Sequence, residues 1–314
     1  MNNASLKIGV VGMGPVGSIL AAHFADAGAW VVACDVVREK TDRIRDSGIR
    51  LVNAIEKQVK VAKTCYSVTE LGGHDLDLVS ISVKTPYLKR VLKELLPVAS
   101  PSLFVMSAQN GIDNEEEVAR VFGRDRTLRM VINYAGSMED LNTVDVTFFN
   151  PPNYLAPLSD HGELLAQRLV GLLNSVGLKT QIPGDIRVHV WTKAIMNAAL
   201  CPVSALTGLT MEDVMETAFG VETVTAILDE GIEVAGKEGI HLPEGFRDQA
   251  LDYMKKGGRH RPSMLVDVEK GLPTEIDHLN GKIVEYGKRH GVATPTNGTL
   301  AALIRLVEKR ITHP

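Results

Sequence analysis

The sequence predicts an α/β domain built on a parallel sheet, followed by an all-helical domain. Short apolar runs alternate with segments of helical spacing as far as residue 182. A glycine-rich turn separates the first run from the first helix, and nearly every segment after Trp191 has helical periodicity. A chain of 314 residues has room for two domains of ordinary size. We therefore expect one domain over residues 1–185 and a second over 186–314.

The first strand, helix and strand can be placed within a few residues. The apolar run 7–11 ends just before a glycine and predicts a buried strand. Residues 18–27 have helical spacing and are followed by Gly28, a residue typical of helix C-termini. A second apolar run, 30–34, completes a unit of about 30 residues, the size typical of a right-handed strand–helix–strand crossover.

The alternation continues along the rest of the chain, with turn residues between segments. Residues 144–155 are β-branched and aromatic without helical period, so we expect antiparallel strands there, at one edge of the sheet. The further strands are predicted at 76–83, 102–106, 128–133 and 178–182, and the further helices at 86–96, 115–122 and 163–176. The helical domain is predicted to contain segments near 191–206, 210–239, 243–256, 262–270, 274–290 and 295–309.

Composition excludes several classes of protein. The formal net charge of −4 is not that of a nucleic-acid-binding protein. Cys34, Cys65 and Cys201 form no CxxC pair, and the histidines form no HxxxH set, so we expect neither a disulfide framework nor a metal site. The chain has no signal-peptide pattern and no run of 18 apolar residues. We expect a cytoplasmic protein without membrane contact.

The glycine-rich turn is the first motif that indicates chemistry. Gly12-Met13-Gly14-Pro15-Val16-Gly17 matches GxGxxG between a strand and a helix, which predicts a Rossmann-type dinucleotide site rather than an ordinary turn. In this motif Gly12 permits the tight turn, Gly14 lets the backbone approach a pyrophosphate, and Gly17 lets the helix pack against the strand.

A carboxylate after the second strand bears on which dinucleotide binds. Asp35 lies 23 residues after Gly12, where it can accept hydrogen bonds from ribose hydroxyls and repel a 2′-phosphate. This favours NAD over NADP. Arg38, three residues further on, could instead reach a phosphate, so NADP stays open.

Several short strings, taken together in order, resemble the ketopantoate reductases, also called 2-dehydropantoate 2-reductases, over essentially the whole chain. The resemblance implies reduction of a small 2-oxo acid by NAD(P)H in a cleft between the two domains. The strings are Val83-Lys84-Thr85, Gln109-Asn110-Gly111, 191–197 (WTKAIMN), 261–267 (RPSMLVD), Thr274-Glu275-Ile276-Asp277, Asn280-Gly281 and Thr294-Pro295.

Roles for individual residues follow from matching positions. The resemblance implies that Lys193 is the general acid that protonates the C2 oxygen, and that Glu275 interacts with the substrate hydroxyl and the lysine. Asn197 and Ser263 would orient the substrate. From the residues alone, Lys193 and Asn197 are spaced i and i+4, so they share one face of a helix. Other interpretations stay open. Lys193 could be a surface lysine at a helix start, Glu275 could interact with a helix dipole, and Ser263 could be a helix N-cap.

Two further residues are assigned to the nicotinamide end of the site by the same resemblance. Lys84 and Asn110 would lie beside the nicotinamide and the catalytic lysine. Asn110 is therefore expected to contact substrate as well as cofactor.

Two positions differ from the family's common pattern at the substrate end. Cys201-Pro202 stands where Asn-Pro is common, and His260 stands where an asparagine often binds substrate. These changes argue against ketopantoate itself as the substrate. The family also resembles NAD-dependent D-2-hydroxyacid dehydrogenases of the D-mandelate type, an alternative that Asp35 fits better. The basic loop 255–261 is either a solvated turn or a site that holds a substrate carboxylate.

The sequence also leaves open a role without catalysis and a dimer interface. A regulator that senses the dinucleotide without turnover is a third alternative, but such a protein needs no proton donor. The long helices near 210–239 and 274–309 could also form a homodimer face.

Overall fold

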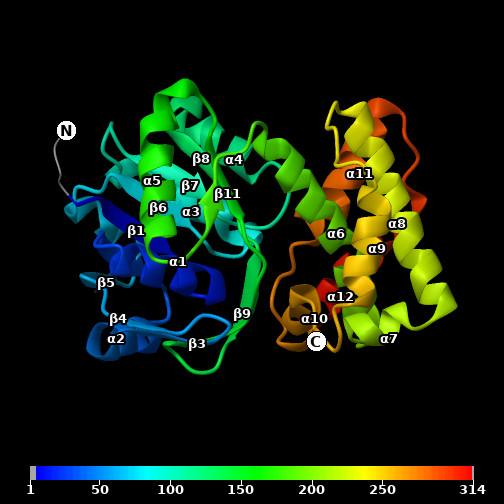
Figure 1. Ribbon diagram of the computed structural model, residues 1–314, viewed down its shortest axis with the longest axis horizontal. Helices are drawn as coiled ribbons and strands as arrows, with labels where there is room; N and C mark the ends of the chain where they lie inside the picture. The colour runs from blue at the N-terminus through cyan, green and yellow to red at the C-terminus, as the bar shows by residue number, and fades with distance from the viewer. Residues whose placement is uncertain (1–4, 313–314) are drawn as a thin grey trace. The chain divides into compact units, whose positions relative to one another are not determined.

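The computed structural model describes residues 5–312, which divide into two compact units (Figure 1). The first unit contains the residues up to Gln109 together with Asp113–Ile186. The second contains Asn110–Ile112 and the chain from Arg187 onward.

An eight-stranded sheet forms the centre of the first unit. Its strands lie in the order β12-β11-β8-β7-β6-β1-β2-β5, and every neighbouring pair is parallel except β11 with β8. The strands are β1 (Lys7–Val11), β2 (Trp30–Cys34), β5 (Lys63–Cys65), β6 (Leu78–Ile81), β7 (Phe104–Ser107), β8 (Thr127–Val131), β11 (Asn153–Pro157) and β12 (Thr180–Gln181). The predicted parallel sheet is confirmed.

The strand order reverses beside β1. The chain runs from β1 to β2 on one side and later returns to place β6 on the other. In an open α/β sheet, ligands bind outside the carboxyl ends of the strands at such a switch point. The Gly12–Gly17 turn follows the carboxyl end of β1, so topology alone places it where a ligand is expected.

The segment 144–155 forms strands with antiparallel partners, as predicted, but these strands do not lie together at one edge of the main sheet, which corrects the prediction. Of its two strands, β11 joins the main sheet beside β8 with β12 beyond it, whereas β10 pairs with β3 and β9 in a second sheet. The second sheet has the order β4-β3-β10-β9, formed by β3 (Ile49–Asn53), β4 (Lys57–Val59), β9 (Tyr134–Met138) and β10 (Thr143–Phe149). The central pairing of this sheet, β3 with β10, joins residues about 90 positions apart in sequence, such as Leu51 and Val144, a separation that local pattern does not reveal.

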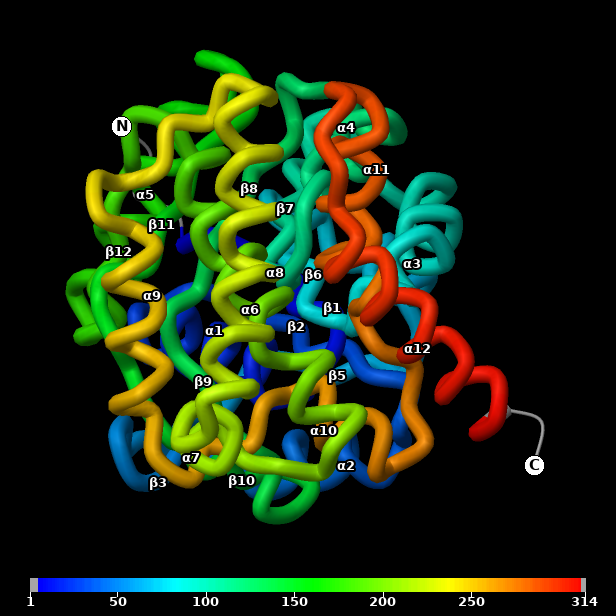
Figure 2. Tube along the Cα trace, turned by 90° about the vertical axis from the view of Figure 1, so that its right-hand side faces the viewer, coloured from blue at the N-terminus to red at the C-terminus, as the bar shows by residue number. Residues whose placement is uncertain are grey.

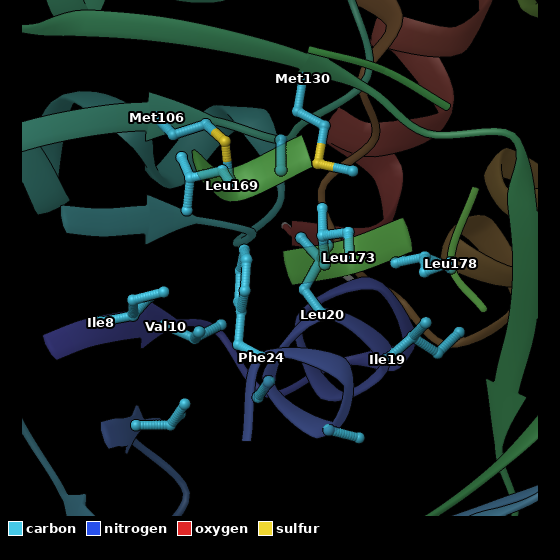
Figure 3. Packing of buried hydrophobic residues seen from close by; sticks show 14 of the residues in the cluster. Ile8, Val10, Ile19, Leu20, Phe24, Met106, Met130, Leu169, Leu173 and Leu178 are labelled. Atoms are coloured by element: carbon cyan, nitrogen blue, oxygen red, sulfur yellow. The ribbon is translucent and has the colours of Figure 1, made fainter. Parts of the chain in front are cut away.

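Both faces of the main sheet are buried in hydrophobic clusters. Val10 packs in a cluster with α1 and α5, whereas the next residue, Val11, packs in a cluster with α3 and α4. Figure 3 shows Leu20 and Phe24 of α1 pointing toward Leu173 and its neighbours on α5. The helices of this unit are α1 (Pro15–Asp26), α2 (Arg38–Ser47), α3 (Leu88–Leu95), α4 (Asn114–Phe122) and α5 (Glu163–Ser175). Burial on both faces explains why the strands are continuous apolar runs.

His23 is a buried histidine on α1 that couples folding to pH. Its side chain is 1% exposed, and its Nδ1 lies 2.6 Å from the carbonyl oxygen of Ile19. Burial lowers its pKa to about 4. In the unfolded chain His23 takes up a proton near pH 6.5, whereas in the folded chain it does so only near pH 4. The free energy of unfolding therefore falls as the pH drops from 6.5 to 4.

We expect the free energy of unfolding to fall by about 2–3 kcal/mol between pH 7 and pH 4.5 through His23 alone. Urea titrations at both pH values measure this difference. His23→Leu removes the titrating group, so its stability should change less over the interval than that of the wild type. His241→Gln, at an exposed position, is the control and should follow the wild type. Equal pH dependence in all three proteins would contradict the assignment.

The second unit is helical, as predicted. The long helix α8 packs against α7, α9, α11 and α12 (Figure 2). The helices are α6 (Ile186–Thr207), α7 (Met211–Met215), α8 (Ala218–Lys237), α9 (Phe246–Lys255), α10 (Ser263–Glu269), α11 (Asn280–His290) and α12 (Pro295–Thr312). Within residues 5–312, no helix is both long enough and apolar enough to cross a membrane.

Two predicted helical segments prove to be divided. The segment 210–239 breaks between α7 and α8 because Thr217 caps the second helix, accepting a hydrogen bond from the Gly220 N–H. Thr210 forms a capping box with Asp213 at the start of α7. In 274–290, a 3₁₀ turn at Ile276–His278 precedes α11.

Candidate functional site

The turn after β1 requires glycine at two of its three motif positions for steric reasons within the protein. Gly12 has φ +93°, in the left-handed region, and its N–H donates to the Cys34 carbonyl at 2.8 Å. A Cβ on Gly17 would lie 1.9 Å from the Gly12 carbonyl oxygen. These two glycines let α1 begin directly against the strand, as the motif predicts.

Gly14 is different, because a Cβ there would meet no protein atom within 4 Å. Gly14 is the N-cap of α1, and no side chain caps this helix end. The first N–H groups of a helix have no intrahelical acceptor and attract anions. Open space above Gly14 beside an uncapped helix N-terminus fits the pyrophosphate of a dinucleotide, so the residues present suit the predicted cofactor.

This contrast gives a prediction that separates folding from binding. Gly14→Val should leave the Tm close to that of the wild type, since its side chain meets no protein atom. It should weaken dinucleotide binding on the order of tenfold to a hundredfold, because it fills the space that the phosphates need. Fluorescence titration with NADH and thermal unfolding measure the two effects. Gly17→Ala is the opposite control, since it should lower the Tm. Unchanged NADH binding by Gly14→Val would contradict the placement.

Asp35 follows β2 and is fixed beside the glycine turn. Its Oδ2 accepts the Met13 N–H at 2.7 Å, and its Oδ1 accepts the Val37 N–H at 2.9 Å. A carboxylate oxygen can accept more than one hydrogen bond, so this arrangement orients the group and leaves it capacity for ribose hydroxyls.

The surroundings of Asp35 include a cation that sequence reasoning missed. Lys40 places its Nζ 3.5 Å from Asp35 Oδ2, and both side chains are mostly buried. Arg38, the cation that the sequence offered as a phosphate contact, lies over the ring of Tyr66 at 4.9 Å from the centroid. The run Arg38-Glu39-Lys40 was the available signal, but only the helical turn of α2 shows which cation approaches the carboxylate.

A hydrogen-bond chain links β8 and β7 to the segment that follows β6, the strand next to β1. Arg129 of β8 donates from Nη1 to Ser107 Oγ at 2.9 Å, and Ser107 Oγ contacts Gln109 Oε1 at 3.3 Å. Gln109 Nε2 then donates to the Val83 carbonyl at 2.8 Å, directly before the half-buried Lys84. The sequence pointed to Lys84 but not to this chain of contacts, whose members are far apart in sequence.

In the second unit, α6 carries the predicted general acid. Lys193 and Asn197 are both half-buried and lie one turn apart on this continuous helix, so they share one face, as predicted. The helix begins at Ile186, so Lys193 lies two turns inside it and not at a helix start. Cys201, four residues after Asn197, is buried on the same helix.

Asn110 and Glu275 are brought together across 165 residues of sequence. Asn110 Nδ2 lies 3.4 Å from Glu275 Oε2, and the Ile112 N–H donates to the His278 carbonyl at 2.9 Å. Glu275 is 5% exposed. The short segment Asn110–Ile112 therefore belongs with the helical unit, although it directly follows Gln109 in the chain.

The remaining candidates lie on and before α10. Ser263 is exposed and is the first residue of α10; Pro262 occupies the N-cap, so the interpretation of Ser263 as the N-cap is wrong. His260 is half-buried and burial lowers its pKa. Its carbonyl accepts the Met211 N–H at 2.9 Å. Arg261 forms an ion pair with Glu269.

Comparison with known proteins decides the family. Residues 8–158 match the family described as ketopantoate reductase PanE/ApbA, and residues 185–308 match its C-terminal domain. The chain belongs to the ketopantoate reductase family. As a member of this family it is an oxidoreductase that acts on CH–OH groups, which confirms the predicted enzyme class and gives no support to a regulator without turnover.

Relatives of the whole chain agree with the family models. The 2-dehydropantoate 2-reductase of Aquifex aeolicus is 29% identical over 312 residues, covering 96% of this chain and 97% of that protein. A ketopantoate reductase structure from Ralstonia eutropha JMP134 has a TM-score of 0.87 at 26% identity, covering 98% of this chain and 100% of that one. A D-mandelate dehydrogenase with NADH and anilino(oxo)acetate shares the fold, with a TM-score of 0.87 at 24% identity and 98% coverage of this chain.

Proposed function

We propose that the chain reduces the C2 carbonyl of a small 2-oxo acid, with Lys193 as the proton donor. The observation that carries this proposal is the pair Lys193 and Asn197 on one face of α6, in a chain whose glycine turn fits a dinucleotide. An ammonium and an amide on the same face can both approach one small oxygen-rich ligand.

Each residue then has a defined task in the reaction. A bound nicotinamide supplies the hydride that reaches C2. Lys193 donates a proton to the C2 oxygen as negative charge develops there, so that the oxo acid becomes a hydroxy acid. Asn197 hydrogen-bonds the substrate and orients its carbonyl, and Ser263 is assigned the same task. Glu275 interacts with the hydroxyl that forms and is held by Asn110.

For the cofactor we propose NAD rather than NADP. Asp35 is fixed by two backbone N–H groups and so keeps a carboxylate next to the turn, where it would repel a 2′-phosphate. Lys40 offsets part of this charge, which is why discrimination between the two cofactors needs a direct measurement.

The identity of the substrate depends on the two positions that differ from the common family pattern. Cys201 offers a thiol, a weak hydrogen-bond partner, where an amide would satisfy a hydroxyl of pantoate. His260 is held neutral by the burial that lowers its pKa. These features support a bulkier, less hydroxylated 2-oxo acid such as phenylglyoxylate, the oxidised partner of mandelate. Ketopantoate is the other candidate, which the family itself favours.

A matrix of two cofactors and two substrates tests the proposal. Purified protein is assayed with NADH and NADPH against ketopantoate and phenylglyoxylate, following absorbance at the nicotinamide band. We expect turnover with NADH, with the higher kcat/KM on phenylglyoxylate. A strong preference for NADPH with ketopantoate would overturn both the Asp35 argument and the substrate assignment. Absence of turnover with all four combinations of cofactor and substrate would overturn the reductase proposal for these acids.

A further inference from the structure

Helix α6, which carries Lys193 and Asn197, has a proline in its interior. Pro202 has no N–H, so it cannot donate the hydrogen bond that the carbonyl of residue 198 expects from four residues later. Ala198 is fully buried, so water cannot readily satisfy its carbonyl. An unpaired buried carbonyl is costly and is almost always given another partner.

Asn280, the first residue of α11, supplies that partner. Its Nδ2 donates to the Ala198 carbonyl at 3.0 Å, and the side chain is fully buried. The donor comes from 82 residues away in sequence. Ala198 directly follows Asn197, so this bond lies at the turn of α6 that presents one of the candidate substrate-binding side chains.

The orientation of the Asn280 amide is fixed by a chain of acceptors. Glu230 of α8 accepts the N–H groups of Thr296 and Asn297 at the start of α12, at 2.8 and 2.9 Å. It also accepts Asn297 Nδ2 at 2.7 Å. Asn297 must therefore turn its Oδ1 toward Asn280, and Asn280 Nδ2 donates to that oxygen at 3.0 Å. The half-buried carboxylate of Glu230 thus orients Asn297, and through it the Asn280 amide that donates to α6.

We propose that Asn280 is a positioning residue for the reaction. Its amide replaces the N–H that Pro202 lacks and holds the turn of α6 that carries Asn197, one turn after Lys193. The inference rests on the proposed function, because it assigns to those two side chains their part in reduction. Asn280 does not touch substrate or cofactor in this scheme. It acts through the Ala198 carbonyl alone.

The first test replaces Asn280 with leucine, which is similar in size and has no donor. We expect Asn280→Leu to lower kcat about tenfold or more with the better 2-oxo acid, since a shift of about 1 Å in a reacting group is that costly. Binding of NADH should stay within about twofold, because the glycine turn lies in the other unit. Assays at 25 °C on protein shown to be folded by circular dichroism distinguish a lower kcat from loss of the fold.

The second test restores the missing N–H. Pro202→Ala gives residue 202 a backbone donor for the Ala198 carbonyl, so it should return kcat of Asn280→Leu to within about threefold of Pro202→Ala alone. A residue that merely fills space would show no such rescue. Should Asn280→Leu not yield folded protein, Asn280→Ser, which is too short to reach the carbonyl, replaces it in the same comparison.

Asn142→Leu is the matched control. Asn142 is also buried and also donates its Nδ2 to a backbone carbonyl, that of Gly48, at 2.7 Å. It lies in the first unit, and its hydrogen-bond partners Gly48, Asp140 and Arg50 are not candidate site residues. We expect a lower Tm with unchanged kcat. If Asn280→Leu behaved in the same way, or if Pro202→Ala gave no rescue, the positioning role would be overturned. A wild type inactive on every 2-oxo acid would instead overturn the proposed function first, and this inference with it.

Discussion

Lys193→Ala should lose on the order of a hundredfold to ten-thousandfold in kcat, the range that a positioned general acid contributes. The hydride cannot add to a carbonyl at a useful rate unless a proton neutralises the oxygen. With alanine at 193, only water remains to donate it. Lys193 is half-buried on a continuous helix and alanine favours helix, so we expect the Tm to change little.

Binding and chemistry can be measured separately in this variant. NADH titration should give a Kd within about twofold of the wild type, since the glycine turn lies in the other unit. A small primary amine added to the assay should restore part of the turnover, because it supplies the missing ammonium. Lys237→Ala, an exposed lysine in the last turn of α8, is the matched control and should keep wild-type kcat.

An active Lys193→Ala variant would contradict the mechanism directly. Loss of turnover together with loss of NADH binding would contradict it as well, because the lysine would then contribute to the cofactor site or to folding. Only loss of kcat with retained binding and amine rescue agrees with a proton donor. This pattern also differs from that of Asn280→Leu, which should respond to Pro202→Ala and not to amines.

The parts of the fold that could be predicted are those that local sequence determines. The strands 7–11 and 30–34 were placed to the residue because both faces of the sheet are buried and the runs are continuously apolar. Between 38 and 65 nothing was assigned. There α2 is strongly polar and the strands β3, β4 and β5 are short. β3 and β5 also pair with strands about 90 and about 30 residues away in sequence.

The candidate site divides in the same way. The glycine turn and Asp35 were found because a motif with fixed spacing encodes them. Their orienting contacts were not, since Met13 N–H and Lys40 meet Asp35 only after α2 forms. The bonds from Arg129 to Ser107, from Gln109 to Val83 and from Asn280 to Ala198 join residues 22 to 82 positions apart. The hydrophobic periodicity of the sequence gives no information on contacts between residues so far apart.

Arg129→Met should lower the free energy of unfolding by about 3–5 kcal/mol at pH 8, the cost of leaving a buried charge without its partner. Arg129 and Glu115 are 2% and 6% exposed, and Arg129 Nε lies 3.4 Å from Glu115 Oε2. The substitution also removes the donor to Ser107, the first link toward Val83. Urea unfolding measures the effect, and Glu115→Leu in the same chain should recover a large part of it, because no lone charge then remains.

The pH dependence of Arg129→Met gives the cause of the loss. Burial raises the pKa of Glu115, and the Arg129 guanidinium opposes that rise. Without the guanidinium the pKa rises further, so the folded variant holds a proton on Glu115 that the unfolded chain releases. Stability supplied by such a group is present at low pH and is lost as pH rises through the raised pKa. The deficit relative to the wild type should therefore shrink from pH 8 to pH 5, whereas a deficit that is the same at both pH values would mean lost packing and not an uncompensated carboxylate.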